Sequence, residues 1–236
     1  MKICLDAGHN NSGWDTGAEG HGLREQDITW LIVKKLQGLL ENIGIDVILT
    51  RAFKEQNLGT DVNSSLRKRV ETCNFHNCDL FVSVHCNSST SSSANGTETL
   101  IVGTGGEAEK LAKCIQDEIV EDLETENRGV KVAPLYVLKN TKCPAVLVET
   151  AFISNELDSL LLRFKHDDFA KAIFSGICKY LDIIQPIEEL ESVEEIVEEF
   201  AKIGVITDTE KWLHKLNADT DVYWLARKSI NYIMGV

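Results

Sequence analysis

The chain has 236 residues, 43% of them hydrophobic, which is enough for one α/β domain of ordinary size with a small second part. Its formal net charge of −13 argues against binding to nucleic acid backbones and against non-specific attachment to other anionic polymers. No apolar stretch has membrane-spanning length and the first residues lack the pattern of a signal peptide, so we expect synthesis in the cytoplasm and no membrane anchor.

The chain begins with a predicted β-α-β unit. Residues 2–5 and 45–49 are short apolar or β-branched runs typical of strands. Between them, apolar residues at helical spacing from Ile28 to Ile43 predict a helix, and Gly44 is typical of the residue that follows a helix.

A second helix is predicted over residues 63–76. The almost entirely apolar residues 79–85 that follow predict a strand buried on both faces, with His85 at its carboxyl end. Residues 88–95 are rich in Ser, Thr and Asn, which indicates a surface loop.

Two more strands and two more helices complete the first part of the chain. A strand over 97–102 precedes a helix whose apolar face runs from Leu111 to Leu123. Residues 145–148 predict another buried strand, which ends at Glu149. A final helix over 169–184 closes this part, because a proline follows it.

The composition changes at Ile187, after which 11 acidic residues stand against 5 basic ones. We expect a first domain at 1–184, an acidic linker at 185–192 and a small helical module at 193–236. Helical spacing of apolar residues inside the acidic run favours an amphipathic helix over a disordered tail. The module is predicted to bind the same target as the first domain or to form a homodimer, and a cap packed on the first domain is the alternative.

The seven cysteines are an odd number, include no CxxC pair and mostly lie within apolar runs. We interpret them as reduced thiols that pack as small apolar side chains.

Three polar side chains suggest a metal site. His9 follows the first strand, Glu25 precedes the first helix and His85 closes a buried strand. Carboxyl ends of strands in an α/β sheet line the crevice where ligands bind, and two imidazoles with one carboxylate suit a catalytic zinc ion. A single histidine is more often structural than a ligand, and His21 is the one competitor for this site.

Glu149 emerges from an apolar strand, so its carboxylate must be paired, face a metal or be protonated. A salt bridge to Arg69 or Arg51 is the structural interpretation. The functional interpretation is a general base that takes a proton from a zinc-bound water and passes it to the leaving amine.

Several segments resemble the zinc-dependent type 3 family of N-acetylmuramoyl-L-alanine amidases, over nearly all of residues 2–182. The matching segments are Ile3–His9, Gly22–Asp27, Val47–Arg51, Leu66–Arg69, Asp79–Asn87, Arg128–Lys131, Leu135–Leu138 and Pro144–Asn155. Departures from the family pattern are Ala7, Cys86 and Thr150-Ala151, and none removes a metal ligand. Cys86 should face away from His85, because side chains alternate along a strand.

The resemblance implies a twisted, mixed and mostly parallel sheet flanked by helices. It also implies one zinc ion held by His9, Glu25 and His85, with Glu149 as the catalytic residue. Arg69 is predicted to orient a carboxylate or to contact the substrate, with packing of a terminal helix turn as the structural alternative. Asn87 is predicted to contact the substrate or to support the site. The implied reaction is hydrolysis of the amide bond between N-acetylmuramic acid and the first L-alanine of the peptidoglycan stem peptide.

Two rival functions share these features: a zinc peptidase that cuts within wall peptides, and a metal-bearing wall-binding protein without activity. The intact Glu149 argues against the second, because a binding module needs no general base. We expect an endolysin or autolysin that reaches the wall after release through a holin or after mother-cell lysis.

Overall fold

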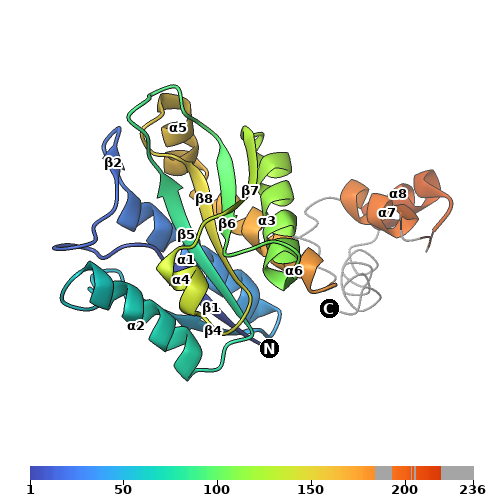
Figure 1. The fold of residues 1–236 in the computed structure, drawn as a ribbon. Coiled ribbons are helices and arrows are strands. Elements are labelled where there is room, and N and C mark those ends of the chain that lie inside the picture. Colours follow the sequence, from blue (N-terminus) through green and yellow to red (C-terminus); the bar gives the residue numbers. More distant parts are fainter. Residues whose placement is uncertain (184–192, 203, 205, 219–236) are drawn as a thin grey trace. The chain divides into compact units, whose positions relative to one another are not determined.

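The computed structural model describes residues 1–183, 193–202, 204 and 206–218 (Figure 1). The chain forms two compact units, Met1–Leu181 and Asp182–Val236. The predicted linker at 185–192 and the apolar residues after 218 lie outside the described residues.

The first unit is built on a six-stranded sheet with the strand order β4-β1-β5-β8-β6-β7. Its strands are β1 (Lys2–Ala7), β4 (Asp46–Leu49), β5 (Leu80–Asn87), β6 (Thr97–Ile101), β7 (Asn127–Val132) and β8 (Ala145–Phe152). The only antiparallel neighbours in this sheet are β6 and β8. The carboxyl ends of β1, β5 and β8 therefore meet at one edge, as expected for a ligand site in such a sheet.

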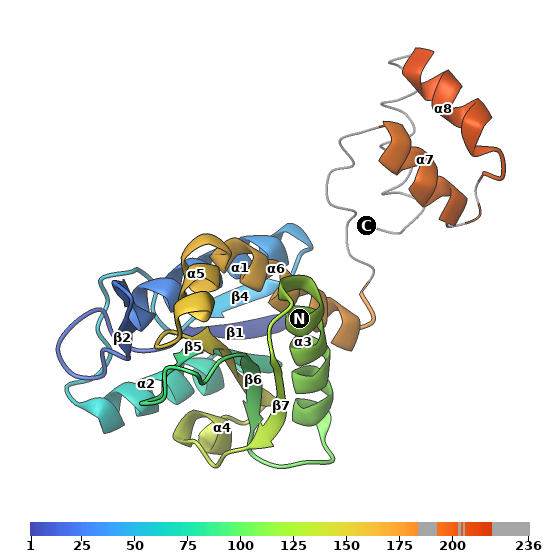
Figure 2. The same ribbon diagram turned by 90° about the horizontal axis from the view of Figure 1, so that it is seen from above.

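Helices cover both faces of this sheet, as Figure 2 shows. One face carries α1 (Glu25–Asn42), α3 (Glu107–Leu123) and α6 (His166–Tyr180). The other carries α2 (Val62–Phe75) and the short α4 (Tyr136–Asn140), while α5 (Glu156–Phe164) follows β8. Since both faces are covered, the central strands β1, β5 and β8 are buried over most of their length.

Local sequence explains where the two helices nearest the site begin. In α2, the Asp61 side chain accepts a hydrogen bond from the Ser64 amide and Ser64 caps Asp61 in return, a capping box. In α1, Glu25 and Asp27 place negative charge in the first turn, where the helix dipole favours it. The helix ends before Gly44, whose positive φ of 78° suits a residue without a side chain.

The second unit contains α7 (Val193–Lys202) and α8 (Thr209–Ala218), which pack against each other. Val197 and Phe200 of α7 are buried, as the amphipathic pattern predicted. Among the residues the structure describes, no helix combines the length and apolar character needed to cross a membrane.

The mixed, mostly parallel sheet flanked by helices confirms the predicted fold class. Two predicted strand ends are wrong: β5 continues beyond His85 to Asn87, and β8 continues beyond Glu149 to Phe152. The sequence analysis also missed β7, α4, α5 and a hairpin of β2 (Glu19–Gly20) with β3 (Leu23–Arg24). β8 extends because Thr150, Ala151 and Phe152 are as buried as the residues before Glu149.

Candidate active site

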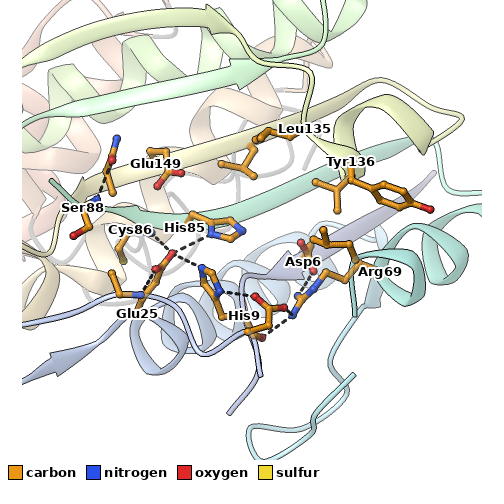
Figure 3. A pocket seen from close by; sticks show the side chains of 16 residues that line it. Asp6, His9, Glu25, Arg69, His85, Cys86, Ser88, Leu135, Tyr136 and Glu149 are labelled. Atoms are coloured by element: carbon orange, nitrogen blue, oxygen red, sulfur yellow. Dashed lines mark hydrogen bonds and ion pairs between the residues drawn. The ribbon is translucent and has the colours of Figure 1, made fainter. Parts of the chain in front are cut away.

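The three suggested metal ligands lie together at the carboxyl ends of β1 and β5 (Figure 3). His9 lies two residues after β1, Glu25 is the first residue of α1, and His85 lies in β5. His9 Nε2 and His85 Nδ1 are each 3.0 Å from Glu25 Oε1. One ligand atom from each residue can be chosen so that all three lie within 4.8 Å of one another.

His9 is oriented by Asp15, a residue of the loop after β1. Asp15 Oδ1 lies 2.8 Å from His9 Nδ1, and Asp15 Oδ2 accepts a hydrogen bond of 2.7 Å from Ser65. A carboxylate behind a histidine fixes the ring and increases the basicity of its other nitrogen. Burial lowers the pKa of His9, but the hydrogen bonds to Asp15 and Glu25 outweigh burial and raise it to about 9.

Glu25 is held by four hydrogen-bonding groups. Its Oε1 binds both histidine rings and accepts the Cys86 amide at 3.0 Å, while its Oε2 accepts the Ala18 amide at 2.8 Å. Burial opposes ionisation of Glu25, but the hydrogen bonds from His85 and His9 outweigh it and lower the pKa of Glu25 strongly. The carboxylate is therefore ionised and fixed in place.

Two glycines leave room for these side chains. A Cβ atom on Gly8 would lie 2.5 Å from Cε1 of His85, and one on Gly17 would lie 2.7 Å from Cδ2 of His9. Gly17 also has a φ of 77°, a conformation that side chains disfavour. The rings can approach Glu25 only because both positions lack a side chain.

Arg69 holds the end of β1 rather than pointing freely into the pocket. It donates to Asp6 Oδ1 at 2.7 Å and to the carbonyl oxygens of Ala7 and His9 at 2.8 and 2.7 Å. Burial raises the pKa of Asp6, but Arg69 and hydroxyl donors lower it to about 2. Of the two predicted roles of Arg69, this geometry favours orientation over substrate contact.

Glu149 lies on β8 opposite His85 of β5, and its carboxylate points towards the His85 and Glu25 side chains (Figure 3). Glu149 Oε2 is buried and has no hydrogen-bond partner. Burial is the main cause that raises the pKa of Glu149 to about 7. The alternative of a salt bridge to Arg69 or Arg51 is wrong, because both guanidinium groups bind Asp6 or backbone carbonyls instead.

A second charged network borders Glu149 on the β6 side. Glu98 of β6 lies opposite Glu149 in the antiparallel pairing of β6 with β8. Glu98 accepts hydrogen bonds from Asn87 at 3.1 Å and from Arg128 at 2.6 Å. Lys131 makes a further ion pair with Glu98 at 2.5 Å. The predicted residue Asn87 therefore lines the pocket with its amide nitrogen engaged by Glu98.

The site occupies a pocket of about 360 Å³. Its polar lining includes the groups described above. Its apolar lining consists of Leu66, Leu135, Tyr136, Val137 and Leu147, together with the smaller Ala18. Such a pocket combines a few fixed polar groups with apolar surface for a ligand.

The structure separates the competing residues from the cluster. His21 lies at the exposed turn between β2 and β3, with its ring 3.4 Å from the Ser154 carbonyl oxygen. The Cys86 thiol accepts a hydrogen bond from Thr150 and is not among the clustered ligand atoms. Sequence reasoning missed Asp15, whose only signal was its place in the polar loop just after His9.

Comparisons with known proteins agree on one family. A family model described as N-acetylmuramoyl-L-alanine amidase (Amidase_3) matches residues 3–179. The chain is 38% identical over 182 residues to the N-acetylmuramoyl-L-alanine amidase LytC of Bacillus subtilis (strain 168), covering 75% of this chain but 35% of LytC. It is 35% identical over 188 residues to the endolysin of Bacillus phage SPP1, covering 77% of this chain and 66% of the endolysin.

A solved structure shows the same likeness. The CwlD amidase from Clostridioides difficile, determined in complex with the GerS lipoprotein, matches with a TM-score of 0.71 and 36% identity. The match covers 77% of this chain and 98% of that chain. Since the family model spans well over half of the sequence, the chain belongs to the N-acetylmuramoyl-L-alanine amidase family.

Proposed function

We propose that this chain hydrolyses the amide bond between N-acetylmuramic acid and the L-alanine of the peptidoglycan stem peptide, with zinc as its cofactor. One observation carries the proposal beyond family membership. His9, Glu25 and His85 cluster in the same pocket as Glu149, whose buried Oε2 has no hydrogen-bond partner within the protein.

The clustered donors fit zinc in type and arrangement. Catalytic zinc sites in hydrolases commonly use two histidines and one glutamate and leave a further position for water or substrate. Asp15 engages Nδ1 of His9, which leaves Nε2 for a metal. The neighbouring cysteines do not compete, because Cys86 lies outside the group of clustered ligand atoms.

Different groups in the pocket have different proposed roles in the hydrolysis. When bound, zinc supplies a Lewis acid that polarises the scissile carbonyl and acidifies a water molecule. Glu149 accepts the proton of the attacking water and transfers it to the leaving nitrogen of L-alanine, a role that suits a carboxylate with a pKa near 7. The apolar side chains of Leu66, Leu135 and Val137, which line the same pocket, limit the access of bulk water to the reacting groups.

The test is digestion of purified peptidoglycan by the zinc-loaded full chain, with mass spectrometry of the released ends. The expected products are stem peptides that begin with L-alanine, and a chelator abolishes their release. Glu149→Gln should lower kcat by about 10²–10⁴-fold, the usual contribution of a general base, without loss of zinc. His85→Ala should lose both the zinc of this pocket and activity, whereas the exposed His76→Ala serves as its matched control and keeps both.

Two outcomes would contradict this function. Cuts inside the stem peptide would identify a peptidase, which uses the same kind of zinc ligands. Absence of cleavage by the zinc-loaded chain, together with retention on the wall, would identify a binding protein.

The role of residues 193–236 stays a prediction, with wall binding and dimerisation as the two candidate functions. Light scattering of the full chain reports its oligomeric state. Co-sedimentation of the inactive Glu149→Gln chain with purified walls reports binding without digestion. The endolysin and autolysin roles use the same chemistry at the same bond.

A further inference from the structure

Four of the seven cysteines lie close together outside the active site, on the side of the sheet that α2 and α4 cover. Cys4 lies in β1, Cys73 in α2, Cys78 in the turn before β5, and Cys143 just before β8. The sulfur atoms of Cys4, Cys73 and Cys78 lie within 4.8 Å of one another, and Cys143 Sγ lies 3.7 Å from Cys73 Sγ. Four separate chain segments thus contribute one sulfur each.

The sulfur positions suit a tetrahedral metal site. With zinc–sulfur bonds of about 2.3 Å, neighbouring sulfurs of a tetrahedron lie roughly 3.8 Å apart. The Cys73–Cys143 separation of 3.7 Å already has this value, and the sulfurs of Cys4, Cys73 and Cys78 lie within 4.8 Å of one another, a group that does not include Cys143. Binding of one ion by all four sulfurs therefore requires the Cys143 side chain to rotate towards this group.

Hydrogen bonds hold three of the four segments, those of Cys73, Cys78 and Cys143, together without any metal. Asn74 donates to the Asn140 carbonyl at 3.1 Å and accepts the Lys142 amide at 2.9 Å, which ties the loop before β8 to the end of α2. The Cys78 amide donates to the Cys73 carbonyl at 3.3 Å. The sulfurs are therefore brought together by the fold, as in a prepared binding site.

Apolar packing alone explains this arrangement less well. Cys4, Cys73 and Cys78 belong to an apolar cluster that also contains Val70 and Phe81, and small apolar residues would fill it without placing sulfurs side by side. Among the described residues, Cys143 is linked to the group of Cys4, Cys73 and Cys78 through its contact with Cys73, whereas Cys114 of α3 and Cys178 of α6 join no group of three clustered ligands. A Cys73–Cys143 disulfide would need the two sulfurs to approach to about 2.05 Å.

We propose that Cys4, Cys73, Cys78 and Cys143 bind one zinc ion as a structural site, separate from the catalytic one. Binding releases one proton from each thiol to the solvent, and the four thiolates fill the coordination sphere. Soft thiolate ligands in a tetrahedral set select zinc over magnesium or calcium. Cys143 is half-buried, which leaves the ion a path from solvent.

This site would brace the helix that supports the active site. Ser65, Arg69 and Cys73 follow one another at intervals of four residues, so they share one face of α2. Ser65 and Arg69 hold Asp15 and Asp6 beside the catalytic cluster. A metal at Cys73 would fix the end of the same face.

The test uses cobalt substitution in the reduced full chain, because the catalytic site offers only nitrogen and oxygen ligands. The expected result is two cobalt ions per chain and a sulfur-to-cobalt charge-transfer absorption. Cys143→Ser should lose this absorption and one ion, while Cys114→Ser, a matched half-buried cysteine, keeps both. His85→Ala should lose one ion and keep the absorption.

Uptake of a single ion without the sulfur absorption would overturn the proposal, as would an unchanged spectrum in Cys143→Ser. The proposal would also be overturned by the following pair of results. The metal-free chain forms a Cys73–Cys143 disulfide in air, and after reduction it binds no metal through sulfur. If Cys143→Ser fails to fold, the wild-type and His85→Ala spectra decide the question, because neither removes a cysteine. Loss of amidase activity leaves these spectra unaffected, so the two proposals fail independently.

Discussion

Replacing Arg69 by methionine should destabilise the protein by about 3–5 kcal/mol, the usual cost of removing one partner from a buried ion pair. Arg69 is 2% exposed and Asp6 is fully buried, with 2.7 Å between the bonded atoms. Without Arg69, Asp6 keeps only the hydroxyls of Thr50 and Ser83, and the Ala7 and His9 carbonyls lose a donor. A comparable exposed pair would contribute at most about 1 kcal/mol.

Urea unfolding of the full chain, followed by circular dichroism, measures this cost. Arg67→Met is the matched control, because Arg67 lies on the exposed side of the same helix and should change stability by less than about 0.5 kcal/mol. Adding Asp6→Asn to Arg69→Met should recover part of the loss, since it removes the unpaired buried charge. A cost below about 1 kcal/mol for Arg69→Met alone would refute the reasoning.

Three further changes test the site itself. Asp15→Asn should weaken zinc binding by about 10–100-fold in chelator competition, because this carboxylate orients His9, which we propose as a zinc ligand. Burial, with a smaller contribution from the Glu98 charge, raises the pKa of Glu149 to about 7. Glu98→Gln should therefore shift the rising acid limb of kcat/KM to lower pH, and an unchanged pH profile would disprove this coupling. Gly17→Ala should abolish zinc binding at His9, Glu25 and His85, whereas Gly13→Ala, with a similar φ of 83° but nothing within 4 Å of the added Cβ, should preserve it.

Much of the fold was predictable because burial leaves a periodic trace in the sequence. The helix from Ile28 to Ile43 and the strand before His85 were recognisable, since α1 buries one face and β5 is buried on both. β7 was missed because its residues are half-exposed or exposed at the edge of the sheet. α5 was missed although Asn155 caps it through the Asp158 amide, a signal that the sequence contained.

The site was predictable where a side chain stands at a strand end, and less so where a loop supplies it. His9 and His85 carried such positions in the sequence, and Glu25 was recognisable as a carboxylate directly before the predicted first helix. Asp15 had no such signal, because only the folded loop brings it to His9 and Ser65. Charge pairing was equally hard to predict. The sequence analysis named two arginines as possible salt-bridge partners of Glu149, but in the structure both bind other groups.

The contrast between Glu25 and Glu149 supports the different roles that we propose for these two carboxylates of one pocket. Both are largely enclosed, yet hydrogen bonds from two histidines and two backbone amides keep Glu25 ionised. Glu149 Oε2 receives none, and burial raises the pKa of this side chain to about 7. A fixed anion suits the holding of a cation, whereas a carboxylate that titrates near neutral pH suits proton transfer. The distribution of donors, and not the residue type, separates the two roles.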